Sequence, residues 1–494
     1  MDALFGTDGI RGTTEFTDEH RSRKLTPELA LRIGQAVGCA LTPTSVLPPP
    51  LPQVGEEGGR GKGVRVALIG RDPRISGMML ESALTAGLLS QGLDVLHAGV
   101  IPTPAVAYLT RRLQADLGVV ISASHNPVED NGIKFFGPDG YKLSDALEDR
   151  IQSLVLDPSC VFIPKNTREL GRSRPAPELA EAYVDYLVRS WRGKQDLSGM
   201  RVVLECANGA TSFVAPEVFR RLGAQVDVLN GNPDGLNINE SYEYIEPRTL
   251  AARVVATGAQ LGVAFDGDGD RVILVDEHGG IVDGDGILAV LARHFHAQGL
   301  LPVPAIVATP MSNFGLYEYL KPLGIEVVEA KVGDKFVLER MRELGTVLGG
   351  EQSGHILILD RGQTTGDGIY TALVVAALMV DEAEGSLSRL TAGIPRYPQA
   401  MVSMDAPRLS VPLTEIPEIR TLVDDLRACA GDGAEVLLRY SGTEDKLRLS
   451  VRTRADGDPR RLTEATYHTL ERIVEIVRAE CATHNTQHAI GGST

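Results

Sequence analysis

Short apolar runs alternate with helix-like stretches through most of the chain, and the same order of segments occurs three times. Each unit has a β-branched run, then a run opened by glycine, then a run opened by Leu-Gly. These runs begin, in that order, at Val64, Arg201 and Pro304; at Gly92, Gly223 and Gly324; and at Leu117, Leu261 and Leu344. Any α/β protein yields strings of this kind, but their fixed order favours a common plan. Apolar strands that alternate with helices predict sheets covered on both faces. We therefore predict three similar α/β domains with mixed, largely parallel sheets.

A polar loop follows the third strand of each unit. The loops are SASHNP over 122–127, DGDGDR over 266–271 and GEQSGH over 350–355. Ligands of parallel sheets bind beyond the carboxyl ends of the strands. The three loops are therefore predicted to form three walls of one site.

The rest of the chain has a different pattern. From about Arg396, strand-like runs around a polar turn precede an amphipathic helix over about 460–480, which predicts a smaller α+β domain. A Pro- and Gly-rich insert over 43–63 predicts a surface loop between a helix at about 27–41 and a strand near Val64. The expected domains span residues 1–170, 171–283, 284–394 and 395–482, followed by a polar tail over 483–494.

Composition and charge exclude several classes of protein. The 494 residues include 49 Lys+Arg and 65 Asp+Glu, a formal net charge of −16, which argues against nucleic-acid partners and anionic membranes. The most apolar run, 370–380, is too short to span a bilayer and predicts a buried helix. The N-terminus has no signal-peptide pattern. Five scattered cysteines form no CxxC pair, which argues against zinc and favours reduced thiols, mostly in the core of a cytoplasmic protein.

The DGDGDR loop is a candidate cation site. Asp266, Asp268 and Asp270 alternate with glycines, and carboxylate oxygens are the ligands that magnesium prefers. The spacing also resembles a calcium loop, with Glu277 at its twelfth position. However, Arg271 stands where that loop requires glycine, and strand-like runs flank the motif instead of helices. An acidic turn without a metal is the remaining alternative.

The SASHNP loop is a candidate phosphoryl carrier. Ser124 lies beside His125, and Lys134 follows ten residues after Ser124. A serine can carry a phosphoryl group covalently when a metal and cations neutralise the charge. The residues show no Ser-His-Asp hydrolytic arrangement. Alternatively, this hexapeptide is a Ser/Asn/Pro turn.

Two further loops offer groups for binding sugar and phosphate. In GEQSGH, the acid, amide and hydroxyl suit sugar hydroxyl groups, although a glycine-rich turn would also explain it. In RYSGTE, over 439–444, the guanidinium and backbone amides suit phosphate. Arg448 and Arg452 share one face of the next strand, either near this loop or as a charged solvent face. The segments FGTDGIRG (5–12) and RDPR (71–74) are ambiguous turns that carry charge.

Together these segments resemble the α-D-phosphohexomutase family, in the family's order and from Phe5 to about Arg452. The resemblance implies four domains around a central cleft, a covalent phosphate on Ser124, and one Mg²⁺ per chain. The implied metal ligands are Ser124, through its phosphoryl group, Asp266, Asp268 and Asp270. The groups implied around the transferring phosphoryl group are Arg11, His125, Lys134 and Arg271. Those implied for the sugar are Glu351, Ser353 and His355, and those for the distal phosphate are Arg439, Ser441, Gly442 and Thr443.

The resemblance also implies an activity. The Gln352 form of the sugar loop points to interconversion of glucosamine 6-phosphate and glucosamine 1-phosphate through a hexosamine 1,6-bisphosphate, which feeds UDP-N-acetylglucosamine and cell-wall synthesis. Lys134 or His125 is expected to accept the proton, with His355 a weaker candidate. The implied protein is a monomer or homodimer that binds a small sugar phosphate.

Several alternatives stay open. They are a glucose, mannose or N-acetylhexosamine phosphate mutase, a phosphatase, and a sugar-phosphate-binding protein without catalysis. Tyr440 and Asp445 replace prolines that are usual in the family's last loop. These two departures loosen the assignment of the substrate.

Overall fold

The structure is a computed structural model that describes most of the chain. It covers residues 4–6, 8–15, 24–41, 65–240, 244, 246–409, 411–440, 446–455 and 457–490, with side chains up to Cys481. The predicted insert over 43–63 lies outside this part of the chain, as do Ser441, Gly442, Thr443 and Asp445.

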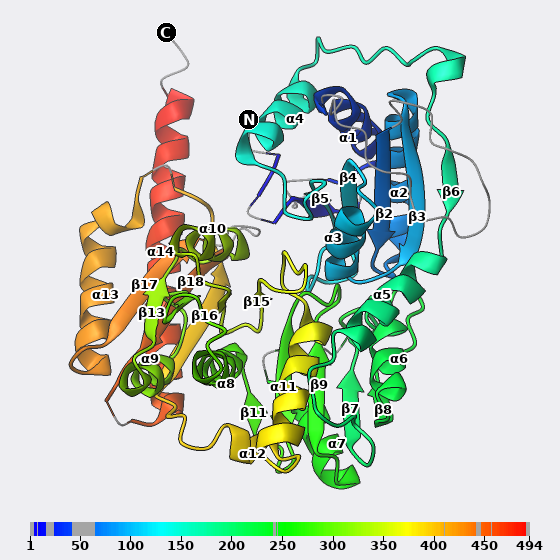
Figure 1. The fold of residues 1–494 in the computed structure, drawn as a ribbon. Helices are drawn as coiled ribbons and strands as arrows, with labels where there is room; N and C mark the ends of the chain where they lie inside the picture. The colour runs from blue at the N-terminus through cyan, green and yellow to red at the C-terminus, as the bar shows by residue number, and fades with distance from the viewer. Residues whose placement is uncertain are drawn as a thin grey trace.

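Four sheets organise the described residues (Figure 1). The first contains β1 (Ile10–Thr13), β2 (Arg65–Arg71), β3 (Leu93–Val100), β4 (Leu117–Ile121), β5 (Asp130–Phe136) and β6 (Ser173–Pro175). The second contains β7 (Arg201–Glu205), β8 (Gln225–Leu229), β9 (Leu261–Phe265), β10 (Val272–Asp276) and β11 (Ile281–Val282). The third contains β12 (Ala305–Ala308), β13 (Glu326–Glu329), β14 (Leu348–Gly350) and β15 (Ile356–Ile358). The fourth contains β16 (Gln399–Asp405), β17 (Glu435–Tyr440) and β18 (Lys446–Arg452).

The first three sheets share one topology. Their common cores have the orders β5-β4-β2-β3, β10-β9-β7-β8 and β15-β14-β12-β13. In each, the first three strands of the unit are parallel and the fourth runs antiparallel to the third. The predicted fold class, three similar α/β units with mixed, largely parallel sheets, is therefore confirmed. β6 joins the first sheet although it follows residue 170, the expected end of the first domain; the domain boundaries stay predictions.

Glycines set where the second strand of each unit begins. Gly92, Gly223 and Gly324 have positive φ angles of 78°, 93° and 73°. Residues with a side chain rarely adopt this conformation, so glycine permits the sharp turn from helix to strand. The third predicted Leu-Gly strand was placed too early, at Leu344. Leu344 ends a helix that Gly345 caps at φ 72°, and the strand begins at Leu348.

Helices cover both faces of the three α/β sheets. They are α1 (Pro27–Ala40), α2 (Ile75–Ser90), α3 (Thr103–Arg112), α4 (Asp145–Leu156), α5 (Glu178–Arg189), α6 (Val214–Arg221), α7 (Arg248–Thr257), α8 (Gly284–Ala297), α9 (Phe314–Leu320), α10 (Asp334–Leu344), α11 (Gly368–Glu382) and α12 (Leu387–Leu390). Alternate residues of β2 show the two-sided packing: Ile69 packs in a core with α1 and α2, and Leu68 in a core with α3. The run over 370–380 is the buried helix α11, as predicted.

The fourth unit is the predicted smaller α+β domain. Its sheet, in the order β16-β18-β17, packs against α13 (Pro417–Ala430) and α14 (Pro459–Ile490), at the left of Figure 1. The helix predicted over about 460–480 runs to Ile490, so most of the expected tail over 483–494 is helical. The segment contains no proline or glycine before Gly491, so nothing in it stops the helix.

Two further expectations concern cysteines and membranes. Only Cys206 is buried, whereas Cys39 and Cys429 are exposed, so the prediction that the cysteines mostly fill the core is wrong. In the part of the chain that the structure describes, no helix is long and apolar enough to cross a membrane.

Candidate active site

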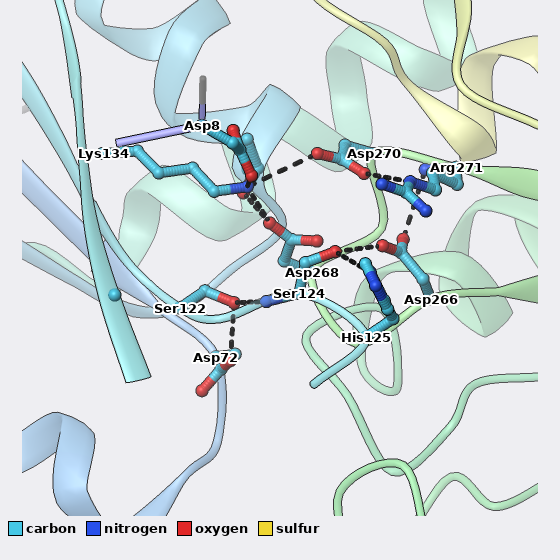
Figure 2. Close-up of polar contacts among 12 residues, drawn as sticks. Asp8, Asp72, Ser122, Ser124, His125, Lys134, Asp266, Asp268, Asp270 and Arg271 are labelled. Carbon is cyan, nitrogen blue, oxygen red and sulfur yellow. Dashed lines mark hydrogen bonds and ion pairs between the residues drawn. The ribbon is translucent and has the colours of Figure 1, made fainter. Parts of the chain in front are cut away.

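The three predicted polar loops each join the third strand of a unit to its antiparallel neighbour. Residues 122–127 connect β4 to β5, residues 266–271 connect β9 to β10, and the loop after Gly350 connects β14 to β15. The first two loops meet directly, because the Ser124 hydroxyl donates a hydrogen bond of 2.6 Å to Oδ2 of Asp266 (Figure 2).

Ser124 is buried in a conformation that is unusual for serine. Its side chain and backbone are 1% exposed, and its φ angle is +53°. This left-handed conformation costs about 1–2 kcal/mol for a residue with a Cβ. The backbone N–H of Ser124 donates to Oγ of Ser122 at 2.9 Å, and that hydroxyl donates to Oδ2 of Asp72 at 2.6 Å (Figure 2). Buried contacts therefore hold the serine in place.

Arg74 also holds the loop of Ser124, through hydrogen bonds from its guanidinium group. It is fully buried, and its Nε forms an ion pair of 2.9 Å with Asp72. Its remaining nitrogens donate to four backbone carbonyl oxygens of the loop, those of Ser124, Asn126, Pro127 and Asp130. A guanidinium is suited to this task because it offers five donors in a fixed plane.

The second unit supports the serine loop from the other side. Nδ2 of Asn239 donates to the carbonyl oxygens of Ser124 and Asn126 at 2.9 Å and 2.8 Å. Gly267 lies so close to this loop that a Cβ at its position would be 2.5 Å from the carbonyl oxygen of Ser124. The first glycine of DGDGDR is therefore needed to let the two loops approach.

The three aspartates of DGDGDR form a buried cluster that fits a hard divalent cation. Asp266, Asp268 and Asp270 are at most 6% exposed, and one carboxylate oxygen from each lies within 4.8 Å of the others. Oδ1 of Asp268 and Oδ1 of Asp270 are buried without a hydrogen-bond partner. Burial, and then the charges of Asp270 and Asp268, raise the pKa of Asp266 well above its usual value. A cation bound among these oxygens would remove that repulsion.

Glu277 does not belong to this cluster. Its carboxylate accepts hydrogen bonds from the hydroxyls of Ser386 and Ser388 and from the N–H groups at the start of α12. The calcium-loop interpretation therefore lacks its twelfth ligand.

Lys134 brings a positive charge to the aspartates. It extends from β5, and its Nζ lies 2.8 Å from Asp268, 3.0 Å from Asp8 and 3.5 Å from Asp270 (Figure 2). Burial alone would lower the pKa of Lys134, but Asp268, Asp8 and Asp270 together raise it well above its usual value. The ammonium group is therefore protonated in this arrangement, which disfavours Lys134 as a proton acceptor.

His125 has the opposite electrostatic setting. Burial, and then the charges of Arg271 and Arg11, lower its pKa well below the usual value. Nδ1 of the neutral ring lies 3.4 Å from Oγ of Ser124. Of the two expected proton acceptors, the structure favours His125.

Arg11 and Arg271 enclose this centre. Arg11 pairs with Asp8 and donates to Oδ1 of Asn126 at 3.2 Å. Arg271 lies 3.8 Å from Asp270, and its buried Nε has no hydrogen-bond partner. Two cations with unused donors beside a buried serine form a setting suited to an anion.

The GEQSGH loop of the third unit, the predicted sugar loop, reaches the aspartate cluster through His355. Nδ1 of His355 lies 3.6 Å from Asp270. Burial alone would lower the pKa of His355, but Asp270 and other carboxylates raise it. Oε1 of Glu351 accepts from the N–H of Gly333 at 3.0 Å, and the carbonyl oxygen of Ser353 accepts from the hydroxyl of Tyr244.

Gln352 points toward the fourth unit. Its Nε2 donates to Oε1 of Gln399 at 3.0 Å, and Nε2 of Gln399 donates to Oε1 of Gln352 at 3.2 Å. Gln399 begins β16. This reciprocal amide pair ties the sugar loop to the first strand of the fourth unit.

The last predicted loop is only partly described. Arg439 stands opposite Arg448 in the register of β17 and β18, and burial and then Arg448 lower its pKa. Two adjacent guanidinium groups suit an anion between them. The hydroxyl of Tyr440 donates to the carbonyl oxygen of Pro407. The other predicted phosphate ligands lie outside the described residues: Ser441, Gly442 and Thr443.

Arg452 has a different role from Arg448. It reaches the carboxylates of Glu329 and Glu435 and the carbonyl oxygen of Ser312, and so anchors the fourth unit to the third.

The sequence did not assign a role to several residues around the site. They are Asp8, Asp72, Arg74, Ser122, Lys142, Asn239 and Asp334. Asp8, Asp72 and Arg74 lie in the two segments that read as ambiguous turns. For Asp72 and Arg74, the position directly after the end of β2 was the only available signal.

Comparison with known proteins identifies the family. Domain I of the phosphoglucomutase/phosphomannomutase family matches residues 2–159, domain II matches 181–280 and domain III matches 283–397. The chain is 46% identical to the phosphoglucosamine mutase of Moorella thermoacetica, over 96% of this chain and 99% of the relative. It is 44% identical to that of Halorhodospira halophila, over 95% and 96%.

Solved structures agree with the sequence relatives. A phosphoglucomutase/phosphomannomutase family protein from Burkholderia thailandensis is 25% identical, with a TM-score of 0.70 over 95% of this chain and 97% of that one. A phosphomannomutase-like structure from Thermus thermophilus has the same fold, with 22% identity and a TM-score of 0.68 over 96% and 100%. With three family domains in order and relatives of this similarity over nearly its whole length, the chain belongs to the phosphoglucomutase/phosphomannomutase family, as the resemblance to the α-D-phosphohexomutases predicted.

Proposed function

We propose that this protein is a phosphoglucosamine mutase, an isomerase that interconverts glucosamine 6-phosphate and glucosamine 1-phosphate. The observation that carries the proposal is the meeting of a buried serine with an aspartate cluster, at 2.6 Å between Ser124 and Asp266, in a chain similar to curated phosphoglucosamine mutases over nearly its full length. Ser124 is the phosphoryl carrier. Its Oγ gives the phosphoryl group to O1 of glucosamine 6-phosphate, and then receives the group at C6 of the 1,6-bisphosphate.

The aspartate cluster is the proposed Mg²⁺ site. Asp266, Asp268 and Asp270 would hold the ion, one per chain, and a phosphoryl group on Ser124 would lie beside the same cluster. When bound, the ion supplies positive charge that stabilises the phosphoryl oxygens during transfer. Lys134, Arg11 and Arg271 add fixed positive charge around the same atoms.

The proton from the attacking sugar hydroxyl goes to His125. The neutral ring stands 3.4 Å from Oγ of Ser124 and its pKa is lowered by burial and by neighbouring arginines, so it is free to accept. His125 then gives this proton to the leaving Oγ of Ser124, which lies 3.4 Å from its Nδ1. In the second half-reaction the Ser124 hydroxyl returns a proton to His125, and the oxygen that leaves at C6 of the sugar takes it. Lys134 places its ammonium group beside Asp268 and Asp270 in both steps.

Two loops divide the binding of the sugar phosphate. Glu351, Ser353 and His355 bind the sugar hydroxyls, and Arg439 with Ser441, Gly442 and Thr443 binds the phosphate that is not reacting. The bisphosphate turns over between the two half-reactions, so one distal clamp serves both ends of the sugar.

Phosphorus NMR tests the proposal. The purified protein with Mg²⁺, glucosamine 6-phosphate and catalytic glucose 1,6-bisphosphate should produce glucosamine 1-phosphate, and Ser124→Ala should abolish it without changing the melting temperature by more than a few degrees. Full turnover in Ser124→Ala would show that Ser124 is not the carrier. Steady release of free phosphate without isomerisation would instead favour a phosphatase. Parallel reactions with glucose, mannose and N-acetylglucosamine phosphates test the substrate.

A further inference from the structure

Six side chains form a closed ring of ion pairs that includes Asp270 of the aspartate cluster. Nζ of Lys134 contacts Asp8 at 3.0 Å and Asp270 at 3.5 Å. On the far side of Asp8, Nζ of Lys142 lies 2.8 Å from its Oδ1 and 2.5 Å from Oδ2 of Asp334. His355 closes the ring, because its Nε2 lies 3.8 Å from Asp334 and its Nδ1 lies 3.6 Å from Asp270.

The ring joins three of the four units with alternating charge. Asp8, Lys134 and Lys142 belong to the first unit, Asp270 to the second, and Asp334 and His355 to the third. None of the six side chains is more than 17% exposed. Buried charge pairs are screened by salt far less than surface pairs. The position and charge of each member therefore affect the positions of its neighbours.

The contact between Lys142 and Asp334 joins the first unit to the third. Beside it lies a groove of about 580 Å³ between the first and third units, lined by Tyr141, Lys142, Asp334, Lys335 and Arg342. The sides of this groove are bridged by ion pairs, Lys142–Asp334 and a second bridge from Lys335 to Asp145 and Glu148. The position of Asp334 against Lys142 therefore depends on how the third unit stands against the first.

Asp334 is also tied to the sugar loop. It is the first residue of α10, and the preceding residue, Gly333, donates its N–H to Oε1 of Glu351 at 3.0 Å. Gly333 has a φ angle of +129°, which only glycine adopts readily. A shift of Glu351 toward a sugar hydroxyl would therefore move Gly333 and the adjacent Asp334. It would thereby change the contact between Asp334 and Lys142.

We propose that Lys142 is a positioning residue for phosphoryl transfer, which links the sugar loop of the third unit to Lys134 through Asp334 and Asp8. This inference rests on the proposed mutase function. Lys142 touches neither the aspartate cluster nor the serine. It holds Oδ1 of Asp8, which leaves Oδ2 of the same carboxylate to fix Nζ of Lys134 against Asp268. Without Lys142, Arg11 and Lys134 still contact Oδ2 of Asp8, but the ion pair at Oδ1 is lost. The carboxylate can then rotate, and the position of Nζ of Lys134 against Asp268 is less well fixed.

Kinetics of matched variants test the proposal. Lys142→Met should lower kcat for glucosamine 6-phosphate by about 10- to 100-fold, the loss expected when a group near the reacting atoms is misplaced, with KM changed less than about threefold. Lys142→Arg, which can keep both ion pairs, should recover kcat to within about threefold of the wild type. Lys335→Met is the control, because it removes the other bridge across the same interface and should leave kcat within about twofold.

A double variant separates the link from general damage. Asp334→Asn should lose kcat as Lys142→Met does, and the two losses should not multiply when combined, because both break one path. If Lys142→Met does not fold, Asp334→Asn decides, since it changes one atom. The proposal is overturned if Lys142→Met keeps wild-type kcat, if Lys335→Met loses as much, or if the losses multiply. An inactive wild type would instead overturn the proposed function.

Discussion

Asn239 offers a sharp test of how the serine loop is held. Its side chain donates two hydrogen bonds, of 2.9 Å to the carbonyl oxygen of Ser124 and 2.8 Å to that of Asn126. Asn239→Asp has the same shape, and its backbone, at φ +56°, is tolerated by aspartate. The change replaces a double donor with oxygens that face two carbonyl oxygens, beside an acidic cluster.

The magnitude follows from the two lost bonds. Each contributes about 0.5–1.5 kcal/mol net, so the pair contributes about 1–3 kcal/mol. If the whole loss falls on the transition state, kcat/KM falls by roughly 5- to 150-fold. The repulsion from the new oxygens places Asn239→Asp at the upper end of this range. Asn239→Gly, which keeps the backbone conformation and removes both bonds without repulsion, should fall near the lower end.

The measurement is kcat/KM in a coupled assay at saturating Mg²⁺, together with the melting temperature of each variant. The order wild type, Asn239→Gly, Asn239→Asp in decreasing activity is expected. A value for Asn239→Asp within twofold of the wild type would refute the claim that the second unit holds the serine loop. Equal activity of the two variants would show that lost bonds matter and repulsion does not.

Three further outcomes are expected. Glu277→Gln should lower the free energy of unfolding by about 1 kcal/mol near neutral pH, because it weakens the bonds from Ser386 and Ser388. Burial alone would raise the pKa of Glu277, but those hydrogen bonds lower it to about 2, below the unfolded value of 4.5. Its contribution is therefore present above about pH 4.5 and lost as the pH falls toward 2, and the difference between the wild-type and variant melting temperatures should shrink over that interval; a constant difference would contradict this. Gln352→Met and Gln399→Met should each raise KM a few-fold, and the double variant should be no worse than either, since both remove one amide pair; additive effects in steady-state kinetics would count against the pair. Mg²⁺ at about 100 times its Kd should stabilise the protein by about 2.7 kcal/mol in thermal melting, and Asp268→Asn should lose most of that gain; an unchanged response would place the ion elsewhere.

Local pattern was sufficient for the fold, and it singled out the two loops that meet at Ser124 and Asp266. The repeated order of apolar runs predicted nine strands of the three α/β units, because alternation and burial are properties of neighbouring residues. The same applies to DGDGDR, where three carboxylates and two glycines carry their chemistry within six residues. Two predicted boundaries were wrong. The strand expected from Leu344 begins later, because the helix before it ends only at the cap Gly345, and the last helix continues past residue 480, because no proline or glycine stops it before Gly491.

What surrounds the centre depended on contacts between distant parts of the chain. Arg74 meets carbonyl oxygens about 50 residues later, and Lys142 meets Asp334 across 192 residues. Neither pair can be recognised from neighbouring residues, because the sequence does not show whether an arginine or a lysine is buried. Gln352 shows the limit most directly, because its pairing with Gln399 is not visible in the loop that contains it.

The sequence by itself therefore determined the repeated sheet plan, the three polar loops at strand ends, and the aspartates and serine on which the proposed chemistry depends. These follow from short-range periodicity and from the chemical character of single side chains. The tertiary structure alone decided which charges face one another, and hence that the pKa of Lys134 is raised, that the pKa of His125 is lowered, and that Lys142 and Asp334 bridge two units. A pKa or an ion pair depends on distance and burial, and both are set only when the sheets pack together.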